Sequence, residues 1–142
     1  MKTLTLLLGL VGLAFTSPAI AGGDDLTPAP ADAAAYIISP KDGETVQSPV
    51  RVVFGLSNMG VAPAGVDNEH TGHHHLLVNH PVPPLDEAMQ NEDGLLHFGG
   101  GQTETVLDLP PGQHTLQLIL GDQYHIPHNP PVLSEVITIT VE

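Results

Sequence analysis

The chain has 142 residues, with 16 acidic and 3 basic side chains, a formal net charge of −13, and no cysteine. Binding to nucleic acid or to an anionic membrane requires clustered lysine and arginine, so this composition argues against both kinds of partner. Without cysteine, neither a disulfide nor a thiolate metal site can form. At this length we expect one domain, with a core mainly of Val, Leu and Ile.

The first 21 residues have the pattern of a secretory signal sequence. Lys2 supplies the positive start, residues 4–15 form an apolar run, and Ala19 and Ala21 give the small-residue pattern of a cleavage site. The apolar run is shorter than the ~20 residues that a membrane-spanning helix needs. We therefore expect cleavage after Ala21 and a periplasmic or secreted protein without a membrane span.

The next segment, residues 22–34, reads GGDDLTPAPADAA and has no apolar period. Its richness in Pro, Ala and Asp is typical of a flexible linker. We therefore predict a signal peptide over residues 1–21, a disordered and dispensable linker over 22–34, and one folded domain over 35–142.

From residue 35 onward, β-branched or alternating segments are separated by turns that contain Gly and Pro. The predicted strands are residues 35–39, 50–57, 72–79, 104–109, 113–120 and 132–141. Short strands at this spacing predict an all-β fold, an antiparallel β-sandwich of the immunoglobulin-like kind. The one helix candidate is residues 84–94, which begin with Pro and end with Gly.

Nine histidines are concentrated in a few segments of the chain. In the predicted strand GHHHLLVN, side chains alternate between faces, so His73 and His75 share one face and His74 lies on the other. Two imidazoles on one face, roughly 6.5–7 Å apart at Cα, can converge on one ion. The alternation does not tell which of the two faces points to the core.

Two further segments can supply ligands. The motif HIPH places His125 and His128 three positions apart, and Pro127 restricts the backbone between them. His97 precedes three glycines in HFGGGQ, which allow close approach to another element or to a ligand. The metal ligands predicted from these patterns are His73, His75, His97, His125 and His128.

The other histidines and the methionines are weaker candidates. We expect His70 and His80 to be structural, because each lies near a turn without a partner on the same face. For His114, a ligand and a hydrogen-bonded residue at the edge of the core remain equally open. Met59 and Met89 can act as soft ligands, but we expect both to be packing residues.

The ligand type limits the choice of metal. Neutral imidazole suits zinc, copper, nickel and iron, and copper(II) heads the affinity order for nitrogen ligands. We therefore expect copper first and zinc second.

A resemblance to a family of small exported bacterial proteins, catalogued as domain of unknown function 4399, is carried by GHHHLLVN, HFGGGQTET, LPPGQHTLQLILGDQYHIPHNPPVLSE and the ending ITITV. It covers roughly residues 38–141 and implies an exported bacterial domain, but it brings no established activity. The recognisable family positions carry over to Gly72, His73, His74, His75, Leu76, His97, Gly99, Gly100, Gly101, Gln102 and Thr103. The stretch SPKDGETVQSPVRVVF also looks like the opening strands of periplasmic copper-resistance β-sandwich proteins, in pattern only.

The leading interpretation is a binding protein and not an enzyme. It would hold copper or zinc for storage, delivery or protection, with the metal ion and another periplasmic metal-handling protein as partners. One alternative is a small copper-dependent redox enzyme, and another is a structural or interaction domain without metal. The serines lack the sequence context of a nucleophile elbow, and there is no positive patch to steer an anionic substrate.

Overall fold

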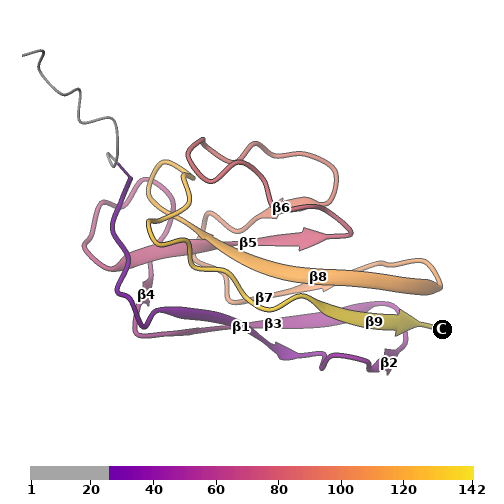
Figure 1. Ribbon diagram of the computed structural model, residues 1–142. Helices are drawn as coiled ribbons and strands as arrows, with labels where there is room; N and C mark the ends of the chain where they lie inside the picture. Colours follow the sequence, from indigo (N-terminus) through magenta and orange to yellow (C-terminus); the bar gives the residue numbers. More distant parts are fainter. Residues whose placement is uncertain (1–25) are drawn as a thin grey trace, which may run out of the picture.

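The structure, a computed structural model, describes residues 26–142, which fold into nine strands in two sheets (Figure 1). The predicted signal peptide, residues 1–21, and the first four residues of the predicted linker lie outside the described residues. Across residues 26–142 there is no helix long and apolar enough to cross a membrane.

The two sheets pack face to face as a sandwich. The smaller sheet has the order β1-β3-β7, formed by β1 (Ala34–Ser39), β3 (Val50–Ser57) and β7 (Glu104–Leu107). The larger sheet has the order β2-β9-β8-β5-β4, formed by β2 (Thr45–Val46), β9 (Ile137–Val141), β8 (Gly112–Gly121), β5 (Thr71–Val78) and β4 (Gly60–Val61), and β6 (Leu95–His97) also pairs with β5. The pairings are antiparallel except β2 with β9 and β4 with β5. The prediction of an all-β sandwich is confirmed.

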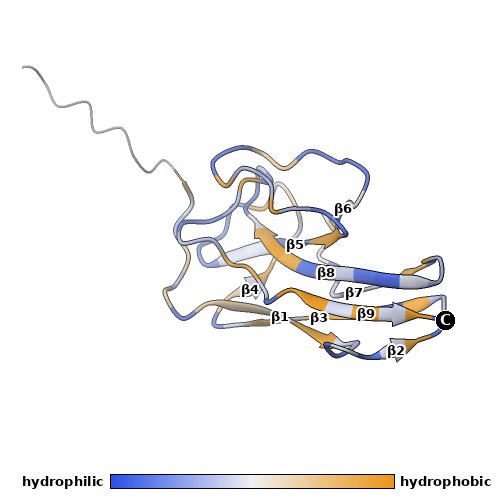
Figure 2. Ribbon diagram, turned by 45° about the vertical axis from the view of Figure 1, so that its right-hand side comes forward, coloured by the Kyte–Doolittle hydropathy of each residue, from blue (hydrophilic) through white to orange (hydrophobic). Residues whose placement is uncertain are grey.

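The main core lies between the sheets and follows the alternation of the sequence. On β8, Leu116, Leu118 and Leu120 are fully buried there, and on β9 Ile137 and Ile139 face the same core. The smaller sheet contributes the buried side chains of β3, Val50, Val52 and Phe54. Each fully buried aliphatic side chain stabilises the fold by about 1.5–3 kcal/mol relative to exposure. Figure 2 shows the apolar segments along the strands.

The last predicted strand is shorter than expected. Regular pairing begins at Ile137, whereas residues 132–134 run beside β8 and exchange single backbone hydrogen bonds with it. The amide of Leu120 donates to the carbonyl of Val132, and the amide of Ser134 donates to the carbonyl of Leu118. The prediction of a strand over residues 132–141 is therefore right only for its second half.

The predicted helix over residues 84–94 is wrong. This segment is a loop between β5 and β6, and its backbone groups bond to other parts of the chain instead of to the preceding helical turn. The amide of Met89 donates to the carbonyl of His125, and the amide of Val78 donates to the carbonyl of Gly94. Local signals for a helix start and stop are overridden here by contacts that tie the loop to the sheet.

The predicted linker also differs from the structure, because its second part belongs to the domain. Thr27 and Ala29 exchange backbone hydrogen bonds with Asn129, at 3.0 and 3.1 Å. Ala29 and Ala33 pack against the main core, and Ala35 is buried in it. From Thr27 onward, the segment is therefore a structural part of the domain.

Candidate metal centre

The outer face of the larger sheet, which points away from the smaller sheet, carries the histidines of interest. Leu76 on β5 lies in the main core between the sheets, so residues of the opposite parity point outward. His73 and His75 lie on this outer face, yet both are almost fully buried. The loops that follow β5 and β8 cover them, on the side of the sheet away from β1 and β3 (Figure 1).

The strand β6 brings His97 next to His75. The two strands are antiparallel, and His97 is the direct register partner of His75. Side chains at directly opposed positions share a face, with Cβ atoms about 4.5–5.5 Å apart. The His97 ring centroid accordingly lies 5.1 Å from that of His75, and the His97 side chain is partly open to solvent.

A tight loop after β8 brings in His125. Asp122, which is 2% exposed, fixes this loop because its Oδ1 accepts hydrogen bonds from the amides of Tyr124 and Ile126, at 2.8 and 3.0 Å. The amide of His125 donates to the carbonyl of Asp122. These bonds hold His125 at φ 69°, a left-handed conformation that is uncommon outside glycine. The other carboxylate oxygen of Asp122 accepts a 2.6 Å hydrogen bond from the hydroxyl of Thr27.

The absence of a side chain at Gly121 lets these groups meet. Gly121 is the register partner of His73 on β8. A Cβ at this position would lie 2.8 Å from Cε1 of His75, 2.9 Å from Cε of Met89 and 3.3 Å from Cα of His125. Any larger residue would therefore push the ligand-bearing segments away from the sheet.

One ring nitrogen from each of His73, His75, His97 and His125 lies within 4.8 Å of those of the other three. Nε2 of His73 and Nδ1 of His125 are 3.0 Å apart. Four nitrogens bound to one tetrahedral zinc ion at 2.0–2.1 Å stand about 3.3 Å from one another. A small readjustment of the imidazoles is therefore enough to bind one ion.

The inner histidines are held in their neutral form. Burial lowers the pKa of His73 to about 4, and any charge on His125 or His97 lowers it further. Burial, together with His73 and His97, lowers the pKa of His75 to about 3. Burial also lowers the pKa of His97, with His125 as the second cause. A metal binds neutral imidazole, so no proton has to be displaced from His73 or His75 near neutral pH.

Several buried nitrogens in this cluster lack a hydrogen-bond partner. Among the described residues, nothing hydrogen-bonds to Nδ1 of His73 or to either ring nitrogen of His75. Leaving one buried polar group unsatisfied costs about 1–3 kcal/mol, and native proteins rarely do so. An ion that binds one ring nitrogen of each histidine would remove part of that cost.

The structure does not bring His128 to this group, although its spacing from His125 predicts it as a ligand. Nε2 of His128 lies 3.1 Å from the carbonyl oxygen of Thr71. Its ring packs beside Gly72, on the face of β5 opposite to His73. The chain turns sharply at His125 and then pairs Pro127 with Gly121, so the two histidines of HIPH point to different places.

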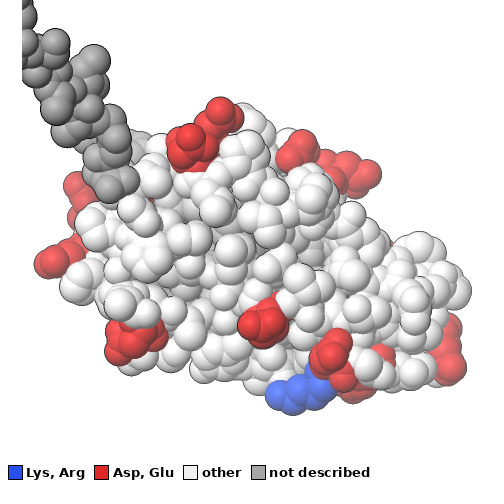
Figure 3. All heavy atoms as spheres, in the orientation of Figure 1, with Lys and Arg blue, Asp and Glu red and all other residues white. Residues whose placement is uncertain are grey.

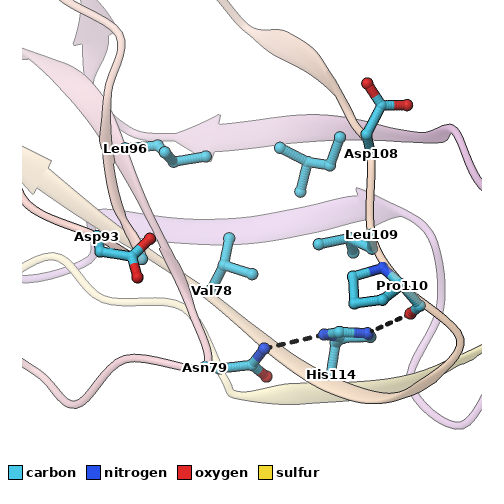
Figure 4. A pocket seen from close by; sticks show the side chains of 10 residues that line it. Val78, Asn79, Asp93, Leu96, Asp108, Leu109, Pro110 and His114 are labelled. Carbon is cyan, nitrogen blue, oxygen red and sulfur yellow. Dashed lines mark hydrogen bonds between the residues drawn. The ribbon is translucent and has the colours of Figure 1, made fainter.

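His114, left open by the sequence, is a hydrogen-bonded residue at the edge of the core. Its Nδ1 lies 2.9 Å from Nδ2 of Asn79, and its Nε2 lies 2.8 Å from the carbonyl oxygen of Pro110. Both ring nitrogens are thus satisfied. His114 lines a pocket of about 460 Å³ together with residues that include Val78 and Leu109 (Figure 4). His70 and His80 also lie outside the metal cluster, each near a glutamate.

The cluster is reached through a second pocket, of about 230 Å³. The pocket is lined by Ala88, Met89, Gln90, Asn91, His97 and His125. His97 and His125 therefore line this pocket, and the buried His73 and His75 do not. Figure 3 shows acidic side chains spread over the visible face with one small basic patch, in keeping with the net charge of −13. Such a surface attracts cations.

Residues 52–142 match the family described as a domain of unknown function, DUF4399. The chain belongs to the DUF4399 family. The matched region contains all four clustered histidines, together with Asp122 and Met89. No curated protein and no solved structure matches the chain.

One residue of this DUF4399 centre, Asp122, was not expected from the sequence, and another, Met89, was expected only as a packing residue. Asp122 fixes the conformation at His125. The sequence signal for this role is an aspartate at the start of the loop DQYHIP, because an aspartate side chain can accept a hydrogen bond from the backbone amide two residues later. Met89 lines the pocket beside His97 and His125, and no local pattern reveals this position because it follows from contacts distant in sequence.

Proposed function

We propose that this protein is an exported metal-binding protein that holds copper, with zinc as the second choice, through His73, His75, His97 and His125. The observation that carries the proposal is the convergence of four imidazoles from three separate segments within 4.8 Å. Two of the four, His73 and His75, are buried and carry ring nitrogens without a hydrogen-bond partner in the described residues, which is unfavourable in itself. An ion shared with His97 and His125 would explain why the fold keeps this pair.

The ligand set supports copper. The chain has no cysteine, and the cluster offers imidazole nitrogens alone. Imidazole favours borderline transition metals over magnesium or calcium, and among them copper(II) binds nitrogen ligands most tightly. Zinc accepts the same four nitrogens in a tetrahedral arrangement.

The arrangement of the ligands supports binding and transfer rather than catalysis. Two ligands lie buried on β5, and the other two line a surface pocket through which we propose that a metal enters or leaves. A buried pair with an accessible pair suits an exchangeable ion that is stored, delivered or kept from harmful reactions. We propose that another exported metal-handling protein supplies or receives the ion.

The proposed location rests on the sequence. Residues 1–21 have the pattern of a secretory signal peptide, which supports a periplasmic or secreted protein. Outside the cytosol, metal buffering by cytosolic thiols does not apply, so a histidine site can compete for copper.

The test is a calorimetric titration of copper(II) and zinc(II) into the untagged chain that begins at Gly22. We expect one ion per chain, and His125→Ala to weaken binding by about tenfold or more because it removes one of four ligands. His80→Ala is the matched control, since His80 lies outside the cluster beside Glu92, and it should bind as the wild type does. If the wild type binds neither ion more tightly than about micromolar, the proposed function is wrong.

A further inference from the structure

Met89 lies at the entrance to the histidine cluster. It is buried, with 7% of its surface exposed, and it lines the same pocket as His97 and His125. Its thioether group is therefore the one soft donor among the residues that form this pocket.

The end of the Met89 side chain meets the ligands over Gly121. A Cβ built on Gly121 would lie 2.9 Å from Cε of Met89 and 2.8 Å from Cε1 of His75, so both side chains occupy the same small space. Cε is bonded to Sδ in methionine, and Cε1 lies between the two ring nitrogens of histidine. The sulfur thus lies in the immediate surroundings of a ring whose nitrogens have no hydrogen-bond partner in the described part of the chain.

The backbone fixes Met89 in this place. Its amide donates a 2.9 Å hydrogen bond to the carbonyl of His125, the residue whose ring closes the cluster. Because this bond joins the loop of Met89 to the loop of His125, the thioether sulfur and the imidazole stay close together when either loop moves. The methionine side chain has three rotatable bonds, so Sδ can turn toward the cluster without a change in the backbone.

Packing alone does not require sulfur here. Met89 also contacts a small apolar cluster of Leu77, Leu95 and Ile119 beside the site. Leucine or isoleucine, used at the other positions of that cluster, would fill the same volume at little cost. The thioether is what distinguishes this position from its neighbours.

We propose that Met89 is a thioether ligand for copper(I), which joins the histidines when the site holds copper in this oxidation state. Thioether sulfur is a soft donor that favours copper(I), whereas zinc(II) and copper(II) are satisfied by imidazole nitrogen. The site then retains copper in both oxidation states and favours copper over zinc under reducing conditions. This inference rests on the proposed function, because it requires that the histidine cluster bind metal.

The experiment compares wild type, Met89→Leu and Met59→Leu in the chain that begins at Gly22. Met59 packs, partly buried, against the main core between the sheets and serves as the matched control for the loss of a thioether. Copper(I) affinity is measured without oxygen by competition with a chromophoric copper(I) chelator, and copper(II) and zinc(II) affinities are measured by calorimetry. We expect Met89→Leu to weaken copper(I) binding by about tenfold or more and to leave copper(II) and zinc(II) within about threefold, and Met59→Leu to change none of them.

Two results overturn the assignment of Met89. Unchanged copper(I) affinity in Met89→Leu shows that sulfur is not a ligand, and an equal loss for all three ions shows that Met89 acts by packing alone. In both cases the wild type still binds copper(II) or zinc(II), so the proposed function stands. A wild type that binds no metal ion removes the proposed function and this inference together.

Discussion

The strand β5 carries buried histidines on both faces, and the two faces place them in different surroundings. On the outer face, His73 and His75 meet His97 and His125, with ring centroids 4.7–5.1 Å apart for neighbouring rings. On the inner face, His74 packs against Phe54 at a centroid distance of 5.2 Å. Within residues 26–142, neither ring nitrogen of His74 has a hydrogen-bond partner.

The comparison shows that burial of a histidine is not sufficient for a metal site. His74 and His75 are adjacent, equally buried and both lack hydrogen-bond partners in the described chain, and burial lowers the pKa of both. Only His75 has other nitrogens within reach of a shared ion. The position of His97 on β6 and of His125 on its loop therefore makes one face a metal centre and leaves the other as a polar group in an apolar core.

The largest effect that we expect is on acid stability, and it involves both faces. The pKa of His73 and His74 is lowered to about 4 and that of His75 to about 3 by burial, compared with an ordinary value of 6.5. Between these values the unfolded chain binds more protons than the folded chain, so the free energy of unfolding falls as pH decreases below 6.5. Above this pH the three histidines are neutral in both states and the effect is absent.

Urea unfolding of the metal-free protein between about pH 7 and pH 4.5 measures this slope. His74→Leu and His75→Leu should each reduce it by about one proton, because each removes one suppressed titration. In zinc-loaded protein, protonation also displaces the metal, so the wild type and His74→Leu should lose stability more steeply than His75→Leu. A wild-type slope of zero across this range would contradict the burial of neutral histidines.

A smaller effect is expected from removal of the segment that supports the outer face. A chain that begins at Ala34 lacks the hydrogen bonds of Thr27 and Ala29 to Asn129 and the contact of Thr27 with Asp122. At about 0.5–1.5 kcal/mol for each lost hydrogen bond, the melting temperature should fall by about 10 °C. Zinc affinity should fall as well, because Asp122 positions the loop of His125.

The control for this truncation is a chain that begins at Leu26, which keeps all of these contacts and should behave as the chain from Gly22 does. Thermal melts followed by circular dichroism, together with zinc titrations, provide the comparison. Equal melting temperatures for the chains from Leu26 and from Ala34 would restore the interpretation of the whole segment as a dispensable linker.

Much of the fold follows from local pattern, because side chains alternate along a strand and the sequence therefore shows which residues share a face. That rule pairs His73 with His75 and separates His74 from them. It cannot tell which face is outermost, since both faces of β5 are buried, one under the other sheet and one under loops. The conformation of the loops does not follow from local pattern. Residues 84–94 have the sequence signals of a helix, but their backbone hydrogen bonds go to distant segments.

The candidate site shows the same limit. A spacing of three residues suggests that His125 and His128 act together, and the left-handed turn at His125 directs them apart. The sequence predicts His97 as a ligand from its neighbouring glycines. The actual reason for its position is the pairing of β6 with β5, which places His97 opposite His75. Tertiary contacts, and not spacing in the sequence, decide which loop histidines join the strand.

The most direct test of the account is a copper(II) titration of the matched pair His75→Leu and His74→Leu, next to wild type. The two substitutions remove adjacent, equally buried imidazoles and differ in the face that they change. Thermal melts first establish that both variants fold. The account predicts one tightly bound ion per chain in wild type and in His74→Leu, and a loss of affinity of about 100-fold or more in His75→Leu. Retention of wild-type affinity in His75→Leu, or an equal loss in His74→Leu, would contradict the assignment of the metal centre to the outer face of β5.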